Sequence, residues 1–181
     1  YIKDESVDLI YLDPQFQSGR DYNALFEEAD GSQSRAQVAA FSDTWEWGPD
    51  AVAAFEAVAA VGDPVSVALV SLRSILGTNS LLAYLSMMAP RLVELRRVLK
   101  PAGSIYLHCD PTASHYLKVL MDCVFGAGGF RNEVIWHYDQ GARGKHEFGH
   151  KHDVIFWYSR SAKEWTFNKD AVLVPFKSKM T

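Results

Sequence analysis

The sequence is poor in cysteine, carries little net charge and lacks a long apolar run. Its two cysteines, Cys109 and Cys123, form no Cys-x-x-Cys pair, and no secretory signal segment opens the chain, so we expect a reducing, cytoplasmic setting. No apolar run approaches the roughly 20 residues that cross a bilayer, so we expect no membrane-spanning helix. The formal net charge of -4 indicates no class of partner, and any contact with nucleic acid must come from local clusters of Arg and Lys.

The sequence does contain enough apolar side chains for a core. Hydrophobic residues make up 48% of the 181 residues and aromatic residues 13%, which is typical of a packed globular domain rather than of a disordered chain. We therefore expect one domain over residues 1–181. Tyr1 already stands in a predicted helix-to-strand connection, and no clear stop precedes Thr181, so we expect the chain to be a fragment.

Hydrophobic periodicity predicts strands that alternate with helices. Short apolar runs predict strands at residues 7–12, 104–109, 133–138 and 153–159, with a weaker extended segment at 165–176. Runs rich in Ala, Leu and Val predict helices at 49–61, 64–77, 79–99 and 112–125, with Pro49 and Pro64 in first turns. Residues 100–103 are expected to form a turn, and 17–47 a long functional loop. The order predicts an open α/β sheet with ligands at the carboxyl ends of its strands, and an antiparallel hairpin at one edge.

The most informative segment is Asp13-Pro14-Gln15-Phe16, which places a carboxylate, a proline and an aromatic ring at the end of a predicted buried strand. An exocyclic amine on a nucleobase is a poor nucleophile, so a catalyst must hold its N–H groups with acceptors and direct its lone pair. Asp13 and the Pro14 carbonyl are candidate acceptors, and Phe16 is a candidate stacking ring for an extruded base. The alternative is that Asp13-Pro14 only ends a strand and that Phe16 packs into the core.

Longer strings of the sequence resemble one enzyme family. The segments 8–16 (DLIYLDPQF) and 18–23 (SGRDYN) resemble the catalytic motif and loop of beta-class amino DNA methyltransferases, which usually have Asp-Pro-Pro followed by Tyr, Phe or Trp. The likeness continues, in family order, through FSDTW (41–45), YLSMMAPRLVEL (84–95), GSIYLHCDPTASHY (103–116), FRNEVIW (130–136) and HDVIFWYS (152–159). The resemblance implies a Rossmann-like methyltransferase sheet of which this chain supplies roughly strands four to seven.

The family resemblance also implies site residues and a cofactor. Asp13, Pro14, Gln15 and Phe16 are the implied catalytic residues, and S-adenosylmethionine is the implied methyl donor. Leu12, Asp13 and Pro14 would form one edge of its pocket. The rest of the cofactor-binding half and most of the target-recognition region are absent from this sequence, since neither the Asp-containing segment before the catalytic motif nor a Phe-x-Gly-x-Gly loop is present. The glycines of 125–129 are better explained as a helix-ending turn.

One departure lies inside the motif itself. Gln15 stands where the family has its second proline, which restores a backbone N–H, frees one φ angle and adds an amide to the site. Because a misplacement of about 1 Å can lower a rate on the order of 100-fold, this change puts catalytic activity in question. The resemblance also places His108, Cys109 and Asp110, which end the strand at 104–109, beside the base pocket, with their individual roles left open. We expect Cys109 to pack rather than to act as a nucleophile.

Basic residues near the motif are candidates for contacts with DNA phosphates. Arg143, Lys145 and Lys151 lie among glycines between two predicted strands, and Arg20 follows the catalytic motif. The alternative is a solvated loop and an ordinary surface arginine. The histidines of the same region match no standard zinc spacing, and we expect no metal.

Two hypotheses for function follow. The first is methylation of the exocyclic amino group of a flipped base in double-stranded DNA by S-adenosylmethionine, with adenine favoured over cytosine, in a restriction-modification-like system. The second is a catalytically inactive fragment that acts as a nucleic-acid-binding or interaction module. In either case a truncated sheet would expose apolar strand edges, so self-association is expected.

Overall fold

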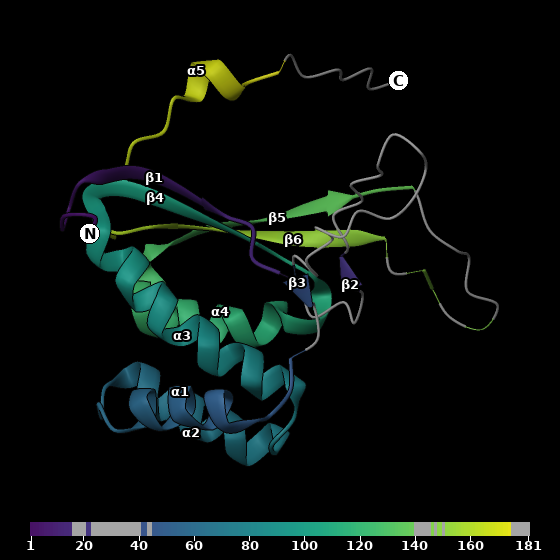
Figure 1. Ribbon diagram of the computed structural model, residues 1–181. Coiled ribbons are helices and arrows are strands. Elements are labelled where there is room, and N and C mark those ends of the chain that lie inside the picture. Colours follow the sequence, from purple (N-terminus) through teal and green to yellow (C-terminus); the bar gives the residue numbers. More distant parts are fainter. Residues whose placement is uncertain are drawn as a thin grey trace, which may run out of the picture.

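The computed structural model describes residues 1–15, 45–139, 146, 148–149 and 151–174, together with the backbone of 21–22 and 41–42. The main sheet is formed by β1 (Val7–Leu12), β4 (Leu99–Cys109), β5 (Phe130–His137) and β6 (His152–Ser159), as Figure 1 shows. Two short strands, β2 (Asp21–Tyr22) and β3 (Phe41–Ser42), pair with each other. The remaining elements are helical: α1 (Pro49–Ala59), α2 (Pro64–Leu76), α3 (Ser80–Val98), α4 (Pro111–Phe125), η1 (Ala127–Gly129) and α5 (Lys169–Val172).

The helices begin where the sequence offers caps. Pro49 and Pro64 lie in first turns, as predicted, where a missing N–H leaves no hydrogen bond unmade. Asp63 caps α2 and Asn79 caps α3, each through a side-chain oxygen that accepts from a backbone N–H three residues on. These caps satisfy donors that would otherwise lack a partner at a helix start.

The strand order of the main sheet is β1-β4-β6-β5. Strand β1 pairs with β4 in parallel, whereas β6 is antiparallel to both β4 and β5. The carboxyl ends of β1 and β4 therefore meet at one edge of the sheet, together with the start of β6 and the end of β5. The open α/β sheet expected from the sequence is confirmed, and Asp13 follows β1 at the edge where such sheets commonly bind ligands.

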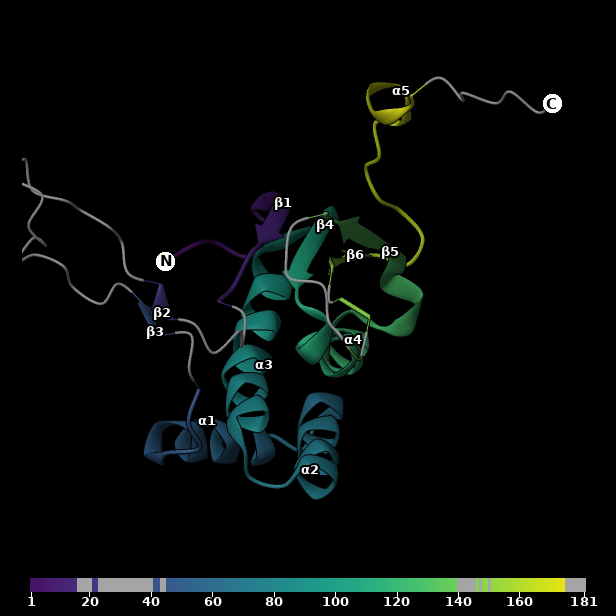
Figure 2. The same cartoon turned by 90° about the vertical axis from the view of Figure 1, so that its right-hand side faces the viewer.

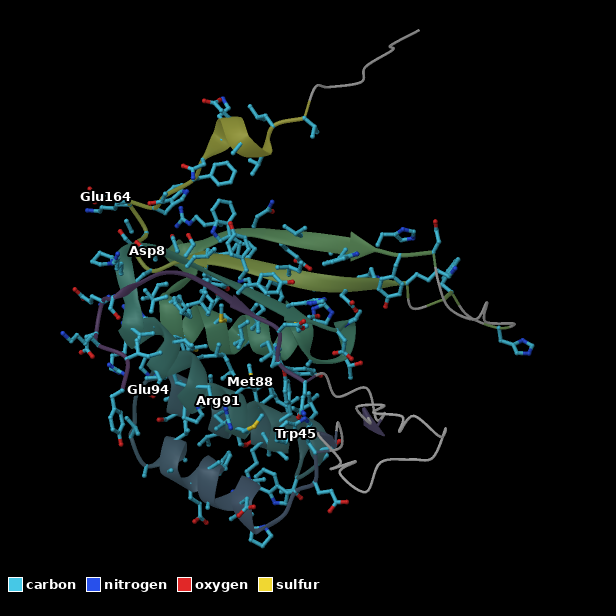
Figure 3. All side chains as sticks on the ribbon, turned by 45° about the horizontal axis from the view of Figure 1, so that its top comes forward. Asp8, Trp45, Met88, Arg91, Glu94 and Glu164 are labelled. Atoms are coloured by element: carbon cyan, nitrogen blue, oxygen red, sulfur yellow. The ribbon has the colours of Figure 1, made fainter. Side chains whose placement is uncertain are left out.

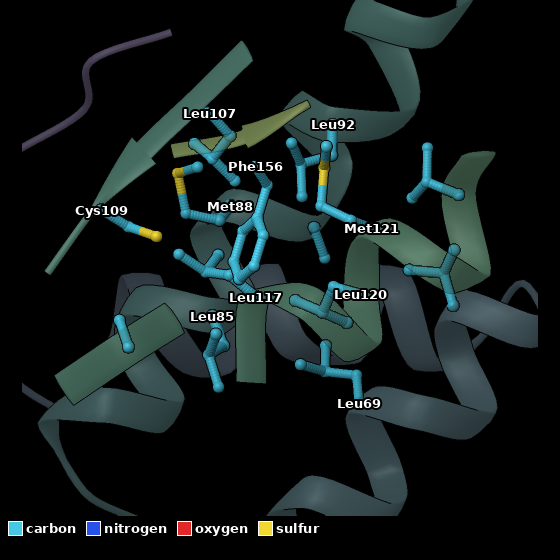
Figure 4. Close-up of a cluster of buried hydrophobic side chains, with 14 of the residues drawn as sticks. Leu69, Leu85, Met88, Leu92, Leu107, Cys109, Leu117, Leu120, Met121 and Phe156 are labelled. Atoms are coloured by element: carbon cyan, nitrogen blue, oxygen red, sulfur yellow. The ribbon is translucent and has the colours of Figure 1, made fainter. Parts of the chain in front are cut away.

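Helices α1 to α4 lie on one face of the sheet in two layers (Figure 1 and Figure 2). Helices α3 and α4 cover the sheet, and α1 and α2 pack beneath them (Figure 2). Buried side chains from β4, β6, α2, α3 and α4 meet between the layers (Figure 4), among them Leu69, Leu85, Leu107, Leu117 and Phe156. Trp45, which precedes α1 and is labelled in Figure 3, lies next to the helices. Its ring packs on Tyr84 of α3 with centroids 5.7 Å apart, which fixes this segment to the helical layer.

The opposite face of the sheet is only partly covered, by the segment that leads to α5 (Figure 1). Phe167 of this segment stacks on Trp157 of β6, with centroids 5.1 Å apart. Leu9 and Tyr11 of β1 and Trp136 of β5 remain exposed. The expected self-association stays a prediction.

Two local predictions were wrong. The turn expected at 100–103 is part of β4, where the register with β1 steps from Val7 opposite Leu99 to Leu9 opposite Ser104. A step of two positions along β1 thus matches a step of five along β4, so the Pro101 region bulges within the strand instead of ending it. The extended segment expected at 165–176 instead contains α5 in its described part. Among the described residues, no helix combines the length and apolar character that a membrane crossing needs.

Candidate active site

Asp13 lies directly after β1, at the edge where the carboxyl ends of β1 and β4 meet. Its side chain is 57% exposed. Leu12, Pro14 and Gln15 around it are half-buried, and Leu12 packs against the core. Asp13 is thus a half-exposed carboxylate directly after a packed strand end. Phe16, the predicted stacking ring, lies outside the described residues.

The side chain nearest to Asp13 is His108 of β4. Its Nδ1 lies 3.2 Å from Asp13 Oδ1, and its Nε2 lies 3.3 Å from Asp153 Oδ2 of β6. His108 is only 11% exposed and Asp153 21%. The His108 imidazole therefore lies between the Asp13 carboxylate, which follows β1, and the less exposed Asp153 carboxylate of β6.

Aromatic side chains fix the plane of this imidazole. Trp136 of β5 stacks on His108 with an interplanar angle of 10° and a centroid distance of 5.8 Å, and Tyr11 of β1 packs against it at a tilt. Partial burial, and then the negative charge of Asp13, raise the pKa of Tyr11, so its phenol is neutral near pH 7. Tyr138 Oη lies 3.5 Å from Asp153 Oδ1.

The second Asp-Pro pair, Asp110-Pro111, does a different job. Asp110 caps α4 by accepting a 3.1 Å hydrogen bond from the backbone N–H of Ala113. The Asp13 carboxylate instead lies 3.2 Å from a ring nitrogen of His108 on the neighbouring strand, and residues 13–15 form no helix. Two segments that look alike in sequence therefore differ in role: the Asp110 carboxylate caps a helix, whereas the more exposed Asp13 carboxylate lies beside His108.

Cys109 ends β4 next to His108 but points into the core. Its side chain is fully buried, and burial followed by the charge of Asp110 raises the pKa of the thiol far above its usual range. The prediction that Cys109 packs rather than acts as a nucleophile is confirmed by its burial.

The predicted phosphate-binding residues are mostly not described. Arg20, Arg143 and Lys145 lie outside the described residues. Lys151 is half-exposed at the start of β6, where its Nζ donates a 3.1 Å hydrogen bond to the carbonyl of Asp139. This end of β6 lies at the same edge of the sheet as Asp13. Within the part of the chain that is described, no three His, Cys, Asp or Glu side chains are grouped to hold a metal ion.

Sequence reasoning missed Asp153 and Trp136 as site residues and left the role of His108 open. The alternation of strand residues was a usable signal for His108, because it places that side chain on the face opposite Leu107 and Cys109. The approach of Asp153 and Trp136 depends on the register of β4, β6 and β5. No local sequence motif predicts that register.

Comparison with known proteins now identifies the family. The family model N6_N4_Mtase, described as DNA methylase, matches residues 7–181. The chain belongs to this DNA methylase family. The resemblance to amino-group DNA methyltransferases found in the sequence is thereby confirmed.

Individual relatives of the family are similar to parts of the chain. The Mod subunit of the type III restriction-modification enzyme StyLTI of Salmonella typhimurium is 32% identical over 73% of the chain and 17% of its own length. The type II methyltransferase M.HpaI of Haemophilus parainfluenzae is 32% identical over 52% of the chain and 30% of its own length. The DNA adenine methyltransferase YhdJ of Escherichia coli is 30% identical over 48% of the chain and 29% of its own length. The matched part of the chain thus spans less than a third of each of these relatives.

Proposed function

We propose that the protein containing this chain methylates the exocyclic amino group of a base in double-stranded DNA, with adenine favoured over cytosine, in a restriction-modification-like system. The observation that carries the proposal is the placement of Asp13: a half-exposed carboxylate at the carboxyl edge of the sheet, in a chain of the DNA methylase family. The relatives named as the Mod subunit of a type III restriction-modification enzyme and as a type II methyltransferase support the same chemistry.

Asp13 and Pro14 are proposed to hold the amine of the target base. The carboxylate accepts one N–H hydrogen bond and the Pro14 carbonyl accepts the other, which directs the nitrogen lone pair away from the ring plane. Phe16 is proposed to stack on the base after it leaves the helix, replacing stacking worth about 1–3 kcal/mol. Arg20, Arg143, Lys145 and Lys151 are proposed to hold the displaced DNA backbone through its phosphates.

S-adenosylmethionine is the proposed methyl donor, and when bound it supplies a methyl group made electrophilic by a positively charged sulfur. Among the described residues, Leu12 lines an apolar groove with Leu95 and Val98, and the charged side chains of Arg91, Glu94 and Arg97 also line it. Asp13 follows Leu12 directly in the chain. Leu12, Asp13 and Pro14 would hold the donor from this side, and Asp13 would also keep the amine in place.

A second candidate function is supported by Gln15. If the loss of the family proline misaligns Asp13, the protein is an inactive relative that binds nucleic acid or another partner without methylating it. This candidate predicts retention of DNA binding and no methyl transfer.

Methyl transfer in the full-length protein separates these candidates. Incorporation of labelled methyl groups from S-adenosylmethionine into double-stranded DNA is expected for the wild type and for Asp8→Ala, an exposed aspartate on the same strand. Asp13→Ala is expected to lower incorporation at least 100-fold. Absence of incorporation by the wild type, with DNA binding intact, would establish the second candidate instead.

A further inference from the structure

The contacts of His108 form a chain of three titratable side chains from three strands. Asp153 of β6 faces Nε2 of the imidazole, and Asp13 faces Nδ1. Register places these residues together: Cys109 lies opposite Val154 and His108 opposite Ile155, so Asp153 follows at the end of the antiparallel pair.

The ring has little freedom to turn away from the two carboxylates. It is 11% exposed, Trp136 lies parallel to it on one side and Tyr11 packs on it at a tilt. A histidine ring nitrogen donates only when it carries a proton, and the partner of one nitrogen decides which tautomer the ring adopts. The charged and titratable groups that face the ring are Asp13, Asp153 and Tyr11, with Tyr138 beyond Asp153.

We propose that His108 is a positioning residue that holds the Asp13 carboxylate in its working orientation, with Asp153 fixing the imidazole from behind. This inference rests on the proposed function, because it concerns how Asp13 is aimed at the target amine. Contact with His108 engages Oδ1 of Asp13 and leaves Oδ2 to accept from the base. Asp13 is more than half exposed, so surrounding side chains restrict its carboxylate little. The contact with His108 would supply that restriction.

A purely structural role is the competing explanation, in which His108 only ties β1 to β4 and β6. Two substitutions separate the roles because each keeps one donor. The amide nitrogen of Asn takes the place of Nδ1, so His108→Asn keeps a donor toward Asp13 and loses the one toward Asp153. The amide nitrogen of Gln takes the place of Nε2, so His108→Gln keeps the contact with Asp153 and loses the one with Asp13.

Steady-state methylation by the full-length protein gives the first test. His108→Gln is expected to lower kcat on the order of 100-fold, with the KM for S-adenosylmethionine changed less than about 3-fold. His108→Asn is expected to stay within about 10-fold of the wild-type kcat, and Asp153→Asn to fall between the two. If both histidine variants lose kcat equally, and in proportion to their loss of thermal stability, His108 has a structural role and the proposal is overturned.

The nitrogen shifts of His108 give the second test, which does not depend on activity. In long-range ¹H–¹⁵N spectra of the 181-residue chain, Asp13→Asn is expected to move the Nδ1 resonance of His108 and Asp153→Asn its Nε2 resonance. If neither resonance moves, the bridge does not exist and the proposal fails. If wild-type protein transfers no methyl group but both resonances move, the proposed function fails while the positioning of Asp13 by His108 stands.

Discussion

The hydroxyl of Tyr158 in β6 donates a 2.6 Å hydrogen bond to the Asp122 carboxylate of α4, which joins the sheet to the helix that covers it. Lys118, one turn earlier in α4, donates to both oxygens of the same carboxylate at 2.8–2.9 Å. The Lys118 ammonium also lies over the Phe130 ring, 4.3 Å from its centroid. Tyr158 itself is fully buried, so its hydroxyl has little access to water as a substitute partner.

Tyr158→Phe is expected to lower the free energy of unfolding by about 1.5–3 kcal/mol, because the mutation removes a buried hydrogen bond to a charged group. Urea denaturation followed by circular dichroism measures the change. Tyr106→Phe is the matched control: this side chain lies on the partly covered face, and its substitution is expected to change stability by no more than about 0.5 kcal/mol. Equal effects of the two substitutions would mean that the bond to Asp122 contributes little.

The same pair predicts sensitivity to alkali. Burial, and then the hydrogen bond to Asp122, raise the pKa of Tyr158 far above its usual range. A raised pKa keeps the phenol neutral in the folded state, so its contribution to stability is complete below the unfolded value of about 10 and is lost as pH rises beyond it. Stability measured between pH 8 and pH 11 is expected to fall more steeply in the wild type than in Tyr158→Phe. Parallel curves would contradict this prediction.

The cap of α2 predicts the opposite dependence at acid pH. Asp63 accepts a 2.8 Å hydrogen bond from the backbone N–H of Ser66, and this bond lowers the pKa of the carboxyl. Its stabilisation is therefore complete above the unfolded pKa of about 3.9 and is lost as pH falls through the lower folded value. Asp63→Ala is expected to cost about 1 kcal/mol near pH 7, and the difference from the wild type should shrink below about pH 4.

Asn79→Ala is the control for Asp63→Ala. Asn79 caps α3 with a 2.9 Å hydrogen bond from the N–H of Leu82, but its amide does not titrate. Its removal should also cost about 1 kcal/mol, with no change in that difference between pH 7 and pH 3. A pH-dependent difference for Asn79→Ala would show that the acid effect arises elsewhere.

Local patterns were sufficient for the elements and for Asp13. The apolar run 7–12 predicted β1 with the bounds that the structure has, and first-turn prolines predicted the starts of α1 and α2. Asp13 was found because a strand end, a carboxylate and a proline are adjacent in the sequence. These features depend on neighbours along the chain, which is the information that periodicity and capping contain.

The partners of Asp13 were beyond such patterns. Asp153 is 140 residues away from Asp13 in the chain, and the two are connected only through the pairing of β1, β4 and β6. The bulge at Pro101 was missed for a related reason: Lys100 to Gly103 have turn chemistry, but pairing on both sides kept them in β4. Strand pairing therefore overrode the local turn signal at Pro101. It also brought Asp153 near Asp13 where no local pattern indicated it.

The two cysteines are expected to differ in reactivity. Cys109 is fully buried and burial raises its thiol pKa, whereas Cys123 is half-buried on α4 with a smaller rise from burial and Asp122. A maleimide reagent at pH 7.5 is expected to modify Cys123 first and Cys109 only when the protein unfolds. Mass spectrometry of peptides after graded labelling measures both rates. Labelling of Cys109 as fast as Cys123 in folded protein would contradict its packing in the core.

Gln15→Pro is expected to increase methyl transfer by the full-length protein. Gln15 follows Asp13-Pro14 at a half-buried position, where a proline would remove one backbone N–H and fix φ near -65°. A more restricted backbone should hold Asp13 and Phe16 closer to their working geometry, and a gain of about 10-fold in kcat corresponds to about 1.4 kcal/mol of transition-state stabilisation. Gln15→Ala is the control, because it removes the amide side chain but leaves φ free. A gain with Ala equal to that with Pro would assign the effect to the glutamine side chain, and no gain with either would show that the family proline is dispensable in this protein.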